Sequence, residues 1–176
     1  WAAFNFTDLY VIGSPDVITQ GGPKNLLLAS QADITLSNYD PYSESSFGNG
    51  KWDLTTSTLN DLMLAANGDI NWQSGMSIVG TSQNLSLYSQ TGNINLGGEL
   101  MVNLISGVFE ANAASNLNIY GSGGQGSEAP SWTATVQAKR VNLTAEGDVN
   151  IGPNAVVKAS EAINIRARGN ISVLDS

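Results

Sequence analysis

The chain has 176 residues, a formal net charge of −8 and only 12% charged residues, about half the usual share in soluble globular proteins. It holds no cysteine and no histidine, which excludes disulfides, thiolate metal sites and catalytic arrangements that use an imidazole. Apart from Lys139-Arg140 and Arg166/Arg168, its seven basic residues are scattered rather than clustered as a nucleic-acid groove requires. No apolar run approaches the roughly 20 residues of a membrane-crossing helix.

Residues 1–24 contain Pro15 and the run Gly21-Gly22-Pro23, residue types that favour turns. We therefore expect an irregular N-terminal junction here, followed by a repetitive region over residues 25–176. The chain opens with Trp1 and not with Met, and we expect it to be a piece of a longer product.

From residue 25 onward, a short apolar–polar–apolar pattern keeps returning, with Asn or Ser at many of the polar positions. It occurs at 26–29, 34–36, 62–65, 70–72, 85–88, 94–96, 102–104, 117–120, 141–143, 149–151, 155–157, 163–165 and 171–173. Period-two alternation is typical of β-strands with one buried face, so we expect an all-β fold. Trp72 and Ile163 fall on apolar positions and are expected in the core.

Turn residues separate these runs at regular places. Asn67-Gly68-Asp69, Thr91-Gly92-Asn93, Glu146-Gly147-Asp148 and Arg168-Gly169-Asn170 each place a glycine before the next strand, where a positive φ is expected. The strand starts after residue 140 fall at 141, 149, 155, 163 and 171, so three steps span 22 residues. This spacing predicts a β-helix, or β-solenoid, with three short strands per coil of about 22 residues, built by one self-coiled chain or as an intertwined trimer.

Two stretches interrupt the pattern and are predicted to be loop insertions, over residues 38–60 and 121–135. Their aromatic residues are the candidate contacts with a partner, because exposed aromatic side chains often anchor interfaces. These candidates are Tyr39, Tyr42, Phe47, Trp52 and Trp132.

The sequence offers little chemistry for catalysis. Gly121, Gly123 and Gly126 match a dinucleotide-binding string, but no amphipathic helix follows, so the string indicates a glycine loop. Asp69 and Asp148 lie in turns and are expected to cap the local backbone. Glu99, Glu110 and Glu161 lie near corners, and no two acids recur at one strand position in adjacent coils. We therefore expect no catalytic residue, cofactor or metal, and no enzyme.

Asn-x-Ser/Thr sequons begin at Asn5, Asn84, Asn142 and Asn170. About three such sequons are expected by chance in a chain of this composition, so they do not by themselves establish glycosylation.

The runs 25–30, 141–151 and 171–175 resemble the repeats of known β-helices. The pattern is similar to the triple-stranded β-helices of phage tail fibres and spikes and to the sarcoglycan-like stalk. The filamentous-haemagglutinin type of adhesin is an alternative resemblance.

These resemblances imply a non-catalytic structural segment of an extracellular or virion fibre or spike, serving as a rigid stalk for attachment. A homotrimer or hetero-oligomer of similar chains would be its assembly, and a cell-surface receptor or glycan its target. The alternatives are a single-chain β-solenoid of a secreted bacterial surface adhesin and, third, a carbohydrate-active β-helix enzyme.

Overall fold

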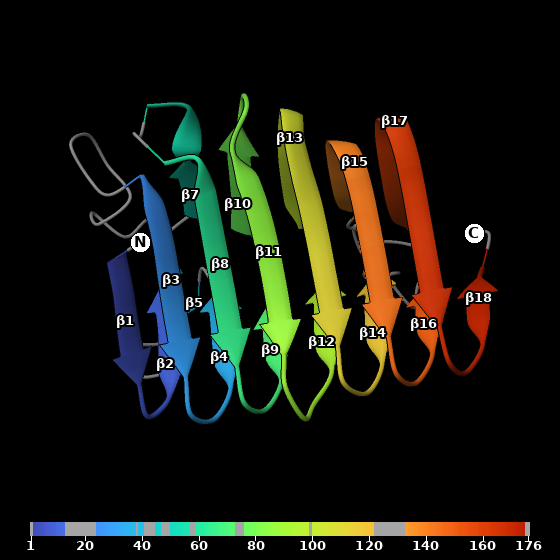
Figure 1. Ribbon diagram of the computed structural model, residues 1–176, viewed down its shortest axis with the longest axis horizontal. Helices are drawn as coiled ribbons and strands as arrows, with labels where there is room; N and C mark the ends of the chain where they lie inside the picture. Colours follow the sequence, from blue (N-terminus) through green and yellow to red (C-terminus); the bar gives the residue numbers. More distant parts are fainter. Residues whose placement is uncertain are drawn as a thin grey trace.

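The computed structural model describes residues 2–12, 24–37, 39–40, 45–46, 50–56, 59–72, 76–98, 100–121 and 133–174. These residues form two parallel β-sheets, which confirms the predicted all-β class. In Figure 1 the strands lie side by side from blue to red, and the two chain termini lie at opposite ends of the row. No helix in the described ranges is long and apolar enough to cross a membrane.

The nine-stranded first sheet consists of β1 (Ala2–Phe6), β3 (Asn25–Ser30), β7 (Gly50–Asp53), β8 (Asp61–Ala66), β10 (Met76–Gly80), β11 (Asn84–Ser89), β13 (Met101–Ala113), β15 (Ala134–Ala145) and β17 (Ala155–Ala167). The seven-stranded second sheet consists of β2 (Leu9–Ile12), β4 (Ile34–Ser37), β9 (Ile70–Trp72), β12 (Ile94–Gly97), β14 (Leu117–Tyr120), β16 (Val149–Ile151) and β18 (Ile171–Val173). A two-stranded antiparallel pair, β5 (Tyr39–Asp40) and β6 (Ser45–Ser46), and the short 3₁₀ helix η2 (Leu54–Thr56) complete the described elements.

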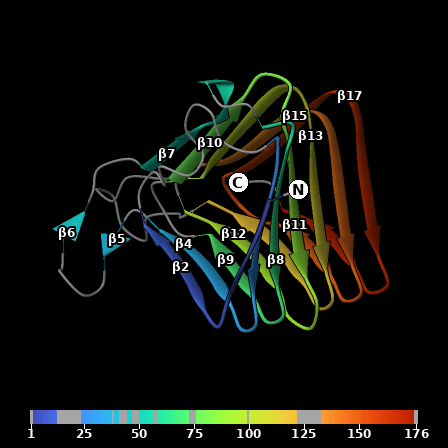
Figure 2. The ribbon, with the colours of Figure 1, turned by 60° about the vertical axis from the view of Figure 1, so that its left-hand side comes forward.

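The chain passes repeatedly from the first sheet through a tight turn into the second sheet. We call one such strand, its turn and the strand that follows a repeat unit. The turns form one row along the lower edge of Figure 1, and Figure 2 shows the two sheets converging on that row. Equivalent residues of neighbouring units pair in parallel, as Asp61 pairs with Asn84 and Val141 with Ile163. Each unit therefore adds one strand to each sheet along a common axis. β7 and β10 are additional strands of the first sheet, where β10 pairs with β7 and with β13.

Alternation along the strands directs one set of side chains into a core between the sheets. Leu62, Leu85, Phe109 and Val141 form one inward row across the first sheet and are at most 1% exposed. Trp72, on the second sheet, is 2% exposed, as the sequence predicts. A single chain thus buries its own apolar rows, so the core shared between intertwined chains, expected for a trimer, is not needed to cover them.

The prediction of three short strands per coil is wrong. The runs 155–157 and 163–165, predicted as separate strands, belong to one 13-residue strand, β17. Residues 158–162 read Lys-Ala-Ser-Glu-Ala, without the Gly, Pro or Asn that a turn favours. Only a register shift against β15, between Ala138 and Arg140, marks the place, so the strand bends without ending.

Other boundaries also differ from the sequence expectations. β1 and β2 lie within residues 1–24, expected to be irregular, and pair with β3 and β4. Within the expected loop 38–60, β7 joins the first sheet through β10, and Leu54 and Leu59 are buried. Residues 122–132, most of the expected loop 121–135, lie outside the described part of the chain.

Ile163 occupies the predicted inward row, but it is 45% exposed because β17 is the last strand of its sheet. Val141, its partner on β15, is fully buried. We predict that Val141→Asp lowers the free energy of unfolding by about 4 kcal/mol or more, because it buries an unpaired charge. Ile163→Asp should cost clearly less.

Urea titration followed by circular dichroism measures both changes. Asn142→Asp, at the neighbouring outward position, is the control and should change stability little. Equal losses for Val141→Asp and Asn142→Asp would contradict the assignment of the inward row.

Candidate functional site

The most regular constellation of polar groups lies in the turns that join the two sheets. One Asp or Asn recurs there in successive repeat units, and its side-chain oxygen accepts a hydrogen bond from the backbone N–H of its equivalent in the next unit. We call this set the turn ladder: Asp33, Asp69, Asn93, Asn116, Asp148 and Asn170. The donor–acceptor distances run from 2.6 to 3.0 Å, which is ordinary hydrogen-bond geometry.

The turn ladder corrects the expected role of the acidic turn residues. Asp69 and Asp148 do cap backbone N–H groups, but those groups belong to the following unit and not to the local turn. Asp69 Oδ1 accepts from the backbone N of Asn93 at 2.6 Å and from its Nδ2 at 3.3 Å. The carboxylates therefore connect repeat units along the axis. The sequence of a single turn does not reveal this role, because the bonded N–H group lies in the next unit.

The glycines beside the turn ladder are needed for space and not for a positive φ. A Cβ on Gly68, Gly92, Gly147 or Gly169 would overlap the side-chain oxygen of the ladder residue one unit before. At Gly92 it would also lie 2.8 Å from the carbonyl oxygen of Gly68. Among the described residues, positive φ occurs instead at Gly98 and Asn154, in connections that return to the first sheet.

Three buried polar side chains that sequence reasoning missed support the corners. Ser89 is 1% exposed; its hydroxyl donates to the carbonyl of Gly68 at 2.7 Å and accepts from the N–H of Gly92 at 3.0 Å. Ser30 accepts from the N–H of Ala32 in the same way. Gln83 Oε1 accepts from the N–H groups of residues 81 and 82 between β10 and β11. The sequence signal that could have identified Ser30 and Ser89 is a serine at a strand end where other units have alanine.

Asparagine side chains form a second ladder on the second sheet. Asn71, Asn95, Asn118 and Asn150 are in register, and the amide nitrogens of the last three each donate to the amide oxygen of the asparagine one unit before, at 2.8–2.9 Å. Asn164 donates to Asn142 similarly on the first sheet. These amides bridge units along the axis, as stacked amides do in cross-β structures.

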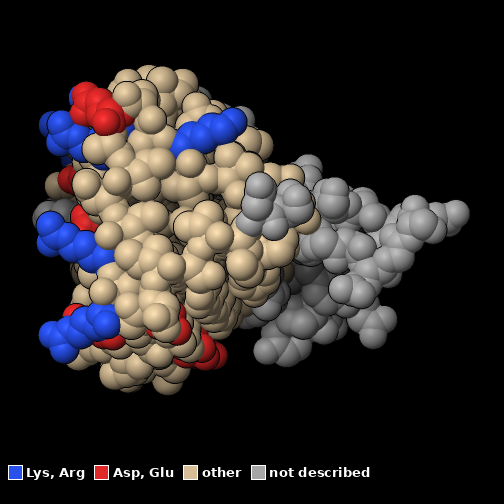
Figure 3. Space-filling view, turned by 90° about the vertical axis from the view of Figure 1, so that its right-hand side faces the viewer, with Lys and Arg blue, Asp and Glu red and all other residues tan. Residues whose placement is uncertain are grey.

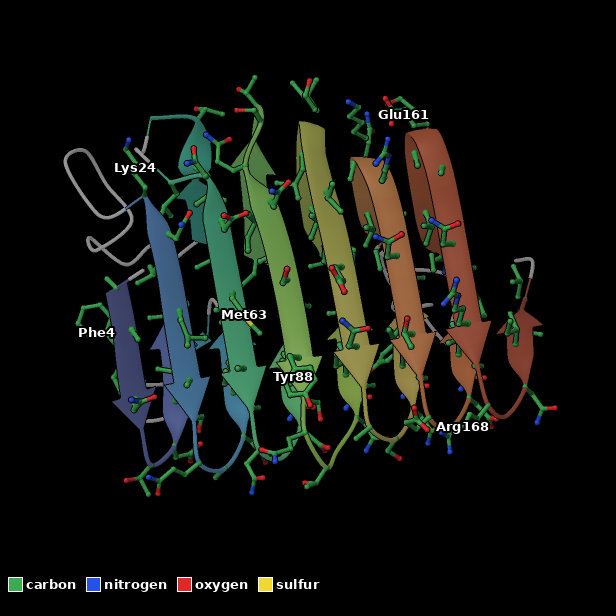
Figure 4. The ribbon with its side chains drawn as sticks, in the orientation of Figure 1. Phe4, Lys24, Met63, Tyr88, Glu161 and Arg168 are labelled. Atoms are coloured by element: carbon green, nitrogen blue, oxygen red, sulfur yellow. The ribbon has the colours of Figure 1, made fainter. Side chains whose placement is uncertain are left out.

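Other acidic side chains form ion pairs or hydrogen bonds that do not belong to the turn ladder. Glu161 contacts Lys139 Nζ at 3.1 Å and Arg140 Nε at 2.8 Å, and these two cations, Lys139 first, lower the pKa of its carboxyl. Arg168 pairs with Glu146 in the turn row, and Figure 4 shows Glu161 at the upper edge, near the middle of β17, and Arg168 at the lower edge, just after the strand ends. Glu110 accepts from Asn112 Nδ2 at 2.8 Å, and Glu99 lies outside the described residues.

A shallow groove of about 290 Å³ crosses the outer face of the first sheet. Its described lining is Glu110, Asn142, Thr144, Asn164 and Arg166. These groups can hydrogen bond a polar ligand at the surface. Glycoside hydrolysis ordinarily requires two carboxyl groups facing one bond, and Glu110 is the one carboxylate in that described lining. In the described part of the chain, no three acidic side chains gather to hold a metal ion.

The described part of the structure does not bring together the five aromatic residues predicted to contact a partner. Tyr42, Phe47 and Trp132 lie outside the described residues, and for Tyr39 and Trp52 only the backbone, in β5 and β7, is described. Of the glycine string, Gly121 follows β14, and Gly123 and Gly126 lie outside the described ranges.

The sequon asparagines differ in how their amides are used. Asn84 donates to Asp61 Oδ1 at 2.9 Å and accepts from the N–H of Val108 at 2.9 Å, so a glycan on its nitrogen would compete with an inter-unit contact. Asn142 accepts from Asn164. Asn5 and Asn170 are exposed, near the first and the last turn.

Comparison of the chain with protein-family models, curated proteins and solved structures finds no match. The resemblance to fibre and adhesin β-helices therefore rests on the repeat pattern of the sequence.

The turn ladder generates a prediction at Asp69. Asp69→Ala removes the acceptor for two N–H groups of Asn93 and should lower the free energy of unfolding by about 2 kcal/mol. Asp69→Asn keeps an oxygen at the same place, as Asn93 and Asn116 do naturally, and should cost less than about 1 kcal/mol.

Urea unfolding of both variants measures the difference. If Asp69→Asn lowers the free energy of unfolding as much as Asp69→Ala does, the negative charge of Asp69 stabilises the protein and its hydrogen bond in the turn ladder does not.

Proposed function

We propose that this chain is a non-catalytic structural segment of an extracellular or virion fibre or surface adhesin, in which it serves as a rigid stalk. The observation that carries the proposal is the continuity of contacts along the axis. Strand pairing, the turn ladder and the asparagine ladder all join each repeat unit to the next in the same direction.

Such an arrangement suits a spacer. In repeat proteins each unit contacts only its neighbours, so length is set by the number of units and the contacts act in series. The apolar rows exclude water along the same axis, which adds resistance to bending. The termini at opposite ends of the row allow neighbouring domains to be held apart (Figure 1).

Between the two assemblies expected from the sequence, burial favours the single-chain stalk of an adhesin. Inward residues of the central units, such as Leu85 and Phe109, are fully buried within one chain. Wrapping around two further chains would give them no additional burial. A side-by-side oligomer of such stalks remains a proposal that the mass of the protein in solution tests.

The third alternative, a carbohydrate-active enzyme, is supported less well. The groove on the first sheet pairs Glu110 with amides, a hydroxyl and Arg166. Glu161, an exposed acid on β17 of that sheet, contacts Lys139 and Arg140, whose positive charges lower the pKa of its carboxyl and so make it unsuited to proton donation.

Rigidity along the axis is directly measurable because the chain has no cysteine of its own. Thr7→Cys and Arg168→Cys place spin labels in the first and the last turn, separated by six strand spacings. At about 4.8 Å per spacing, pulsed dipolar spectroscopy should give one narrow distance distribution centred near 29 Å.

A matched pair, Thr7→Cys with Gln90→Cys, spans three spacings and should give about half that distance. A broad distribution in the longer pair, with a narrow one in the shorter pair, would show that the units bend relative to one another and would overturn the rigid stalk.

A further inference from the structure

Two shallow grooves adjoin on the outer face of the first sheet, and Thr144 lines both of them. The first is the groove of about 290 Å³ that contains Glu110. The second has a volume of about 390 Å³, and Tyr88, Asn112 and Glu146 belong to its lining. We call the two together the face groove. Its size is sufficient for a small ligand or a short stretch of a chain-like one.

Two rows of outward side chains cross the face groove along the axis of the stack. In one row Tyr88 on β11 is followed by Asn112 on β13 and Thr144 on β15. In the other row Glu110 is followed by Asn142. These three strands are each paired on both sides. Each step along a row is one strand spacing of about 4.8 Å, close to the length of one sugar unit in an extended polysaccharide.

An aromatic ring lies at one end of the face groove. Tyr88 is 43% exposed although β11 is an interior strand, because its neighbour on β8 is the small Ala65. Figure 4 shows Tyr88 on the outer face of the sheet, near the end of β11. The electron-rich face of an aromatic ring attracts the polarised C–H groups that one side of a pyranose presents. Tyr88 therefore provides a platform for one sugar ring.

The polar side chains beside this platform are fixed by one another and keep capacity for a ligand. Asn112 Nδ2 donates to Glu110 Oε1 at 2.8 Å, and Asn142 Oδ1 accepts from Asn164 Nδ2 at 2.9 Å. The first bond engages one of two carboxylate oxygens, and the second engages none of the amide protons of Asn142. Planar amide and carboxylate groups can each bridge two neighbouring hydroxyls, which is the pattern that a sugar ring offers.

The charges of the face groove favour a neutral ligand. The lining holds Glu110 and Arg166, of opposite sign, and Glu146 is paired with Arg168. The described lining with this ion pair thus has no net formal charge, whereas the whole chain carries −8. Figure 3 shows that the charged side chains along this side of the molecule are of both signs. A polyanion would be repelled by the field of the protein, whereas a neutral polyhydroxyl chain would not.

We propose that the face groove binds an extended, neutral, β-linked oligosaccharide that lies across β11, β13 and β15. One ring packs on Tyr88, and the following rings hydrogen bond to Asn112, Thr144 and Asn142. A flat β-linked chain keeps successive rings over successive strands, whereas a coiled α-linked chain leaves a straight row. The inference goes beyond the proposed stalk, and the two can fail separately, because label distances report rigidity and titration reports binding.

Titration of the wild-type chain with cellohexaose and with chitohexaose, followed by NMR, is the first test. At least one of these sugars should shift the backbone amides of Tyr88, Asn112 and Thr144 to saturation. A concentration of about 10 mM nearly fills a site with a dissociation constant of roughly 1 mM, so weak binding is also detected. Maltohexaose, which is α-linked, and heparin, which is a polyanion, should leave these amides unshifted.

Variants then locate the bound sugar. Tyr88→Ala removes the platform and should weaken binding about tenfold or more, whereas Tyr88→Phe keeps the ring and should bind within about threefold of the wild type. Thr144→Val removes one hydroxyl at nearly constant volume and should weaken binding about fivefold. Tyr120→Ala, at a tyrosine 45% exposed on the second sheet, is the matched control and should bind like the wild type.

Three results would overturn the proposal. One is the absence of any shift at the three amides with both β-linked sugars at about 10 mM. Another is equal affinity of Tyr88→Ala and the wild type, which would place the sugar elsewhere. The third is a response of these amides to heparin alone, which would show that the face groove selects a polyanion. Tyr88→Thr replaces Tyr88→Ala if circular dichroism shows that the latter is unfolded.

Discussion

The hydrogen bond that each ladder oxygen accepts from the backbone N–H of the next turn is the constraint on which the rest of the structure depends. Parallel strands with alternating faces are vulnerable to slippage, because a shift of one residue turns every inward side chain outward. The turn ladder fixes the register at one end of each strand pair, where Asp148 holds Asn170 and thereby aligns Val149 with Ile171. With the register fixed, equivalent apolar residues stack upon one another, and a continuous core forms between the sheets.

Other features follow from this geometry. A ladder oxygen occupies the space that a Cβ would need on the next unit, so glycine precedes Asp69, Asn93, Asp148 and Asn170. The same stacking brings outward asparagines within hydrogen-bond distance, so that the amides of Asn95 and Asn118 bridge units at no cost to the core. The proposed role as a stalk follows from this one arrangement.

Much of the strand pattern was predictable, because alternation with period two is a local property: the runs around Leu62, Leu85 and Val141 are strands with the expected inward faces. The predictions that were wrong concern features that depend on contacts between repeat units. The merging of two predicted strands into β17 follows from pairing with β15, and the need for Gly92 follows from a carboxylate 23 residues earlier. β1 was missed because residues 1–24 lack a repeated partner in the sequence, whereas the structure supplies one in β3. The predicted aromatic contacts lie where no side chain is described, so they stay predictions.

The central claim, that the turn residues hold the repeat units in register, is tested most directly by amide hydrogen exchange measured by NMR under native conditions. The backbone amides of Asp69, Asn93, Asn116 and Asp148 lie in surface turns, yet each donates to the side chain of the preceding unit. They should therefore exchange as slowly as the strand amides of the same unit, through opening of the stack. Exchange at the rate of unstructured surface amides, with the strand amides still protected, would show that the ladder does not hold the register and would contradict the account.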